Sequence, residues 1–71
     1  METTLTIDGM SCGHCVRAVE TALGAVPGVT VEAVTVGEAR LRVGDPSQRE
    51  ATVGAAVEAV EAEGFRVLAT A

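Results

Sequence analysis

The apolar positions divide the 71-residue chain into two similar halves, and each half has the pattern of a strand, a helix and a strand. Residues 4–8 alternate polar and apolar side chains, as a strand with one buried face does. After a loop over residues 9–13, residues 13–26 show the three- and four-residue apolar spacing of an amphipathic helix. Residues 29–36 are rich in β-branched side chains and predict a second strand. The apolar stripe of the predicted helix consists of Val16, Val19, Ala22, Leu23 and Val26.

The second half of the chain repeats this order, beginning with a strand that forms a hairpin with residues 29–36. Its predicted elements are a turn at Gly37 and Glu38, a strand at residues 39–43, a loop at residues 44–47, a helix that Gly64 ends, and a strand at residues 65–69. The apolar stripe of this helix consists of Val53, Ala56, Val57 and Val60. The residues that could cap its start are Asp45, Ser47 and Thr52.

Six elements in the order strand, helix, strand, strand, helix, strand predict an α+β fold. The economical packing places two helices on one face of a four-stranded antiparallel sheet, which is the ferredoxin-like βαββαβ sandwich. The other face of the sheet is then left to solvent. No linker or low-complexity segment divides residues 1–71, so we expect a single domain. A chain of this length has no room for a catalytic cleft beside a separate substrate domain, and we do not expect an enzyme.

Charge and aromatic content exclude several kinds of partner. The net charge is −5, from ten acidic residues against five arginines, and the only aromatic residue is one Phe. An acidic chain without aromatic stacking platforms is a poor ligand for nucleic acid, and its charge disfavours anionic membranes. No apolar run approaches the roughly 20 residues that a membrane span needs, and no signal peptide begins the chain. We therefore expect a cytoplasmic domain without direct membrane insertion.

Chemistry is concentrated in the segment from Gly9 to Cys15, which contains both cysteines of the chain. Cys12 and Cys15 lie where the first loop runs into the first helix, and unpaired N–H groups with the helix dipole favour thiolates there. The two intervening residues allow one sulfur on the loop and one in the first helical turn, so both can converge on a single ion. Soft thiolates select soft ions such as Cu(I), for which two ligands suffice.

Other uses of the cysteine pair remain open. Structural zinc requires four ligands, and the only additional nearby candidate is His14, which we expect to be exposed to solvent. A thioredoxin-like redox couple would need a larger sheet and a nearby aromatic residue or proline. A redox-sensing pair and two inert core cysteines are further alternatives. In a reducing compartment, a metal or redox site is favoured over a structural disulfide.

The segment Gly9-Met10-Ser11-Cys12-Gly13-His14-Cys15 resembles the GMxCxxC signature of the heavy-metal-associated domain family. That family includes bacterial copper chaperones and the metal-binding domains of copper-transporting P-type ATPases, and the resemblance extends over nearly the whole chain. It implies that Cys12 and Cys15 bind one Cu(I) per chain and that Met10 packs inward beneath the loop. It also implies that Phe65 lies beside the metal loop, where an aromatic ring shields the site.

Function and partner follow from the same resemblance. It implies a carrier that passes Cu(I) to a copper-transporting P-type ATPase or to another metal acceptor protein. Because the chain begins with Met and ends just after its last strand, a free-standing chaperone is favoured over an excised ATPase domain. The alternatives are the same module selective for Hg(II), Zn(II) or Cd(II), and a thiol–disulfide redox protein. A homodimer bridged by copper is left open.

Overall fold

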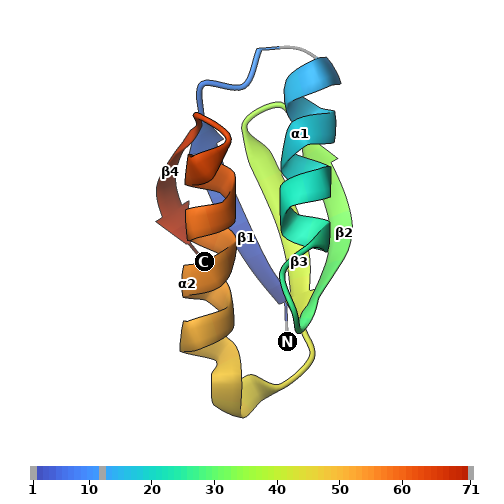
Figure 1. The fold of residues 1–71 in the computed structure, drawn as a ribbon, viewed down its shortest axis with the longest axis vertical. Coiled ribbons are helices and arrows are strands. Elements are labelled where there is room, and N and C mark those ends of the chain that lie inside the picture. Colours follow the sequence, from blue (N-terminus) through green and yellow to red (C-terminus); the bar gives the residue numbers. More distant parts are fainter. Residues whose placement is uncertain (1, 12, 71) are drawn as a thin grey trace.

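The computed structural model describes residues 2–11 and 13–70. Within these residues, strands and helices follow the order that the sequence predicts (Figure 1). They are β1 (Glu2–Asp8), α1 (Gly13–Gly24), β2 (Val29–Thr35), β3 (Glu38–Val43), the short 3-10 helix η1 (Pro46–Gln48), α2 (Arg49–Ala62) and β4 (Arg66–Thr70). Neither α-helix is long and apolar enough to cross a membrane.

The four strands form one sheet in the order β2-β3-β1-β4, and each neighbouring pair is antiparallel. Both helices cover the same face of this sheet (Figure 1), which confirms the ferredoxin-like fold. Strand β1, one of the two central strands, pairs with β3 at Leu5 and Ala39, and with β4 at Ile7 and Val67. The molecule is elongated, with extents of 33 × 18 × 18 Å, and the loop between β1 and α1 lies at one end (Figure 1).

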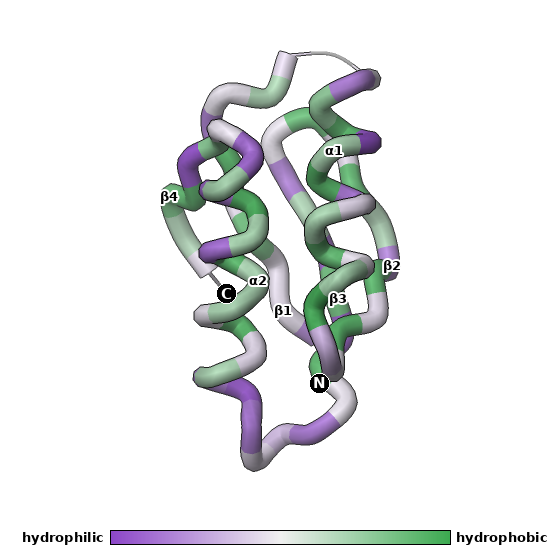
Figure 2. Tube along the Cα trace, in the orientation of Figure 1, coloured by the Kyte–Doolittle hydropathy of each residue, from purple (hydrophilic) through white to green (hydrophobic). Residues whose placement is uncertain are grey.

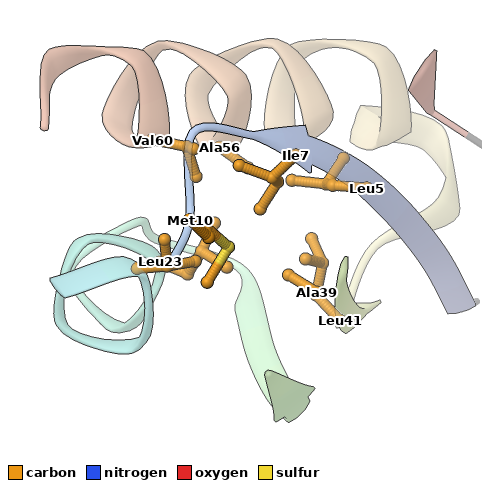
Figure 3. Close-up of a cluster of buried hydrophobic side chains, with 9 residues drawn as sticks. Leu5, Ile7, Met10, Leu23, Ala39, Leu41, Ala56 and Val60 are labelled. Carbon is orange, nitrogen blue, oxygen red and sulfur yellow. The ribbon is translucent and has the colours of Figure 1, made fainter. Parts of the chain in front are cut away.

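The hydrophobic core lies between the sheet and the two helices (Figure 3). Alternate residues of β1 and β3 face it, and both predicted helical stripes supply its other wall. Val16, Ala22 and Val57 from these stripes are only half-buried. The buried members are Leu5, Ile7, Ala39, Leu41 and Val43 from the sheet, and Val19, Leu23, Val53, Ala56 and Val60 from the helices.

Helix α1 ends at Gly24, two residues before the predicted end at Val26. The proline at position 27 disfavours helical backbone in the residue before it. The last turn therefore tightens: the Val26 amide donates to the Leu23 carbonyl at 3.1 Å, a bond of the 3-10 type. Val26 is nevertheless buried, which confirms its predicted core position. The prediction that its backbone is helical is wrong.

The hairpin turn lies one residue earlier than predicted, at Val36 and Gly37, because Thr35 and Glu38 already pair as strand residues. Gly37 has φ 90°, which a side chain would strain, and this requirement fixes the turn at the glycine. The last strand is likewise shifted by one residue and leaves Phe65 in the preceding loop.

The N-terminal cap forms at Asp45, one of the three candidates. Its Oδ1 accepts hydrogen bonds from the Ser47 amide at 3.0 Å and from the Ser47 hydroxyl at 2.7 Å. The capped element is η1, with Pro46 in its first turn, and α2 follows directly. Gln48 stands at the N-cap position of α2 without a side-chain hydrogen bond, so Ser47 and Thr52 are not its caps.

Candidate metal centre

The candidate metal loop, residues 9–13, connects the end of β1 to the start of α1. Cys15 lies in the first turn of α1, where it is half-buried and packs against the core. Cys12 lies outside the described residues. The first turn of α1 holds no acidic residue, so no carboxylate within that turn offsets the positive end of the helix dipole beside the loop.

Met10 points away from the loop surface into the core, beside Leu23 (Figure 3). Only 8% of its surface is exposed, which confirms the predicted packing role. Its Sδ accepts a hydrogen bond from the Gly37 amide at 3.4 Å. The thioether thus fills a space between β1, α1 and the β2–β3 turn, as a flexible apolar side chain can.

Gly9 and Phe65 bring the loop before β4 against the metal loop. Gly9 has φ 98°, a conformation that glycine adopts without strain, and it turns the chain out of β1. A Cβ built on Gly9 would lie 3.7 Å from Cδ1 of Phe65, so the ring lies directly beside this backbone. Phe65 is half-buried and packs on the core. Its predicted place beside the metal loop is confirmed.

His14 and Arg17 lie on the outer side of α1. Both are exposed, as the sequence predicts for His14, and with Gly13 they line a shallow depression open to solvent. Figure 2 shows purple, hydrophilic segments alternating with green, hydrophobic ones in this first part of α1. Asp8 is also exposed, on the opposite side of β1 from Ile7. In the part of the chain that the structure describes, no three His, Cys, Asp or Glu side chains lie close enough together to hold a metal ion.

Sequence reasoning did not identify Gly37 as a neighbour of the metal loop. The glycine itself is a visible turn signal, but nothing in its local pattern indicates that its amide reaches Met10. This contact depends on the sheet order, which places the β2–β3 turn beside the end of β1.

Comparison with known proteins agrees with this arrangement of fold and loop. Residues 4–66 match the heavy-metal-associated domain, and the chain belongs to this family. The copper chaperone CopZ of Staphylococcus haemolyticus is 38% identical over 63 residues, which cover 89% of this chain and 91% of the relative. The copper chaperone CopZ of Bacillus subtilis is 36% identical over 64 residues, covering 90% and 91%.

Solved structures show the same relationship. A CopZ metallochaperone superposes with a TM-score of 0.79 at 34% identity, over 96% of this chain and 100% of the other. A copper binding domain from HMA7, a P-type ATPase, superposes with a TM-score of 0.74 at 30% identity, over 99% and 97%. The N-terminal domain of ZntA in its Zn(II) form has a TM-score of 0.71 at 19% identity, a likeness of fold alone.

Proposed function

We propose that this protein carries one Cu(I) ion on Cys12 and Cys15 and transfers it to an acceptor protein. The observation that carries the proposal is a half-buried Cys15 in the first turn of α1, within a family domain whose similar relatives are copper chaperones. Phe65 against Gly9 and Met10 beneath the loop supply apolar surroundings on the inner side of this segment.

The proposed chemistry is ligand exchange on a soft ion. Two thiolates at a helix N-terminus are stabilised by its dipole and bind Cu(I) with a low coordination number. An acceptor thiolate adds to the bound ion to give a three-thiolate intermediate, and one resident thiolate then leaves. Copper remains Cu(I) throughout and no substrate bond is cleaved, so the protein is a carrier and not an enzyme.

The proposed acceptor is the metal-binding domain of a copper-transporting P-type ATPase. The likeness to a copper binding domain of such an ATPase supports this choice, because a donor and an acceptor of similar fold can present matching thiolate pairs. The exchange requires reduced cysteines, and the proposal therefore places the protein in the cytoplasm, where thiols are kept reduced.

The test is an anaerobic Cu(I) titration of the reduced protein against a chromophoric chelator. We expect one Cu(I) per chain, and we expect Cys12→Ser and Cys15→Ser each to weaken binding by more than about 100-fold, beyond the loss typical of an outer-shell group. Ser11→Ala, a change in the same loop that removes no thiol, should bind as the wild type does. A wild type that loses copper to the chelator while holding Zn(II) or Hg(II) would overturn the copper assignment.

Transfer needs its own measurement. Copper-loaded protein is mixed with a separately labelled ATPase metal-binding domain, the two are separated, and copper is quantified in each. We expect copper to equilibrate between them within the mixing time. Copper that stays with the donor would refute the carrier role, and reduction of insulin disulfides by the metal-free protein would indicate a redox function instead.

A further inference from the structure

The β2–β3 turn contacts the end of β1 and the first part of the metal loop through the backbone of Gly37. Its carbonyl accepts a hydrogen bond from the Ile7 amide at 2.9 Å, and its own amide donates to the Met10 thioether at 3.4 Å. The turn therefore spans the end of β1 and the first part of the loop. Figure 1 shows the turn between β2 and β3 at the same end of the molecule as the loop between β1 and α1.

From this geometry we propose that the Gly37 backbone amide positions the metal loop by holding the Met10 side chain. The inference rests on the proposed function and goes beyond it, because it assigns a positioning role to a turn that contributes no ligand. Met10 precedes Cys12 by two residues, so the covalent chain limits the distance between their Cα atoms to about 7 Å.

Burial makes the amide-to-sulfur contact effective although a thioether is a weak acceptor. Met10 is 8% exposed and Gly37 is half-buried, so water has limited access to the donor. Loss of the acceptor would leave the Gly37 amide poorly satisfied, and such groups are costly to bury. The hydrogen bond from the Ile7 amide to the Gly37 carbonyl also fixes the position of the turn, so the turn offers Met10 a fixed partner.

The test exchanges the sulfur of methionine for other atoms while leaving the shape of the side chain nearly unchanged. The chain contains two methionines, Met1 and Met10, so biosynthetic replacement changes few sites. Norleucine removes the acceptor, whereas selenomethionine keeps one at the same two positions and is the matched control. Val53→Ala is the second control, because Val53 is buried in α2, outside the metal loop, and its truncation weakens the core without touching the Gly37 contact.

We expect norleucine to accelerate hydrogen exchange of the Gly37 amide by about tenfold and to raise the Cu(I) dissociation constant by about twofold to tenfold, the range for loss of one modest hydrogen bond. The Cu(I) stoichiometry should stay unchanged. Selenomethionine protein should match the wild type in both measurements, and Val53→Ala should lower stability while its Cu(I) dissociation constant stays within about twofold of the wild-type value.

Three results would overturn the inference while leaving copper binding intact. They are an unchanged Gly37 exchange rate in norleucine protein, an unchanged Cu(I) affinity despite faster exchange, and an equal loss of affinity in Val53→Ala. A wild type that binds no Cu(I) refutes the proposed function instead. The positioning role is then tested in metal-free protein by amide relaxation measurements. Norleucine must increase the backbone mobility of Ser11 and Gly13, and unchanged mobility would refute the positioning role.

Discussion

Replacement of Thr3 by valine should stabilise this protein. Thr3 lies on strand β1 opposite Leu41, its side chain is 0% exposed, and its hydroxyl has no hydrogen-bond partner among the described residues. A buried hydroxyl without a partner costs about 1–3 kcal/mol, and valine has nearly the same shape and the same preference for strands. We expect Thr3→Val to raise the free energy of unfolding by about 1–2 kcal/mol and Tm by about 4–16 °C.

The matched control is Thr6→Val, the same chemical change on the exposed side of the same strand. It removes a solvated hydroxyl, and its effect should stay within about 0.5 kcal/mol. Urea unfolding of the reduced, metal-free protein measures both variants. Far-UV circular dichroism is the suitable signal, because the chain contains neither Trp nor Tyr. A Thr3→Val protein no more stable than the wild type, or an equal gain in Thr6→Val, would refute the reasoning.

Three further substitutions test the backbone and surface contributions to stability. Gly54→Ala should stabilise α2 by about 0.5–1 kcal/mol, since Gly54 lies within the helix and an added Cβ would contact nothing within 4 Å. Gly9→Ala should instead lower the free energy of unfolding by about 1 kcal/mol or more, because a side chain is strained at φ 98°. Both are measured by urea unfolding, and a gain from Gly9→Ala would contradict the argument. Arg42→Ala should change the free energy of unfolding by less than about 0.5 kcal/mol, because the Arg42 side chain is 62% exposed although it forms a 2.9 Å ion pair with Glu32. Double-mutant cycles with Glu32→Ala at low and high salt would check this.

The elements of this protein follow from local periodicity in the sequence. The alternation around Leu5 and Ile7 predicts β1, and the stripes through Val19 and Leu23 and through Ala56 and Val60 predict the helices, because each element must bury one face. The motif that carries Cys12 and Cys15 is likewise visible without coordinates. Their role as ligands remains a prediction of the sequence and of the family.

Element ends were less accurate where neighbouring residues compete. The stripe extends to Val26, but Pro27 ends the helical backbone sooner. The pairing of Thr35 with Glu38 likewise leaves Val36 and Gly37 as the hairpin turn. Val26 is buried in either case. Periodicity therefore indicates which side chains enter the core more reliably than it indicates where hydrogen bonding stops.

Only the tertiary structure decides which distant residues surround the metal loop. The hydrogen bond from Gly37 to Met10 and the ring of Phe65 against Gly9 join groups that are far apart in the sequence. The same packing leaves the buried hydroxyl of Thr3 without a hydrogen-bond partner among the described residues. Local pattern determines which face of an element is buried. It does not determine which side chain from another element meets that face, because this depends on sheet order and register, and both are set by packing of the whole chain.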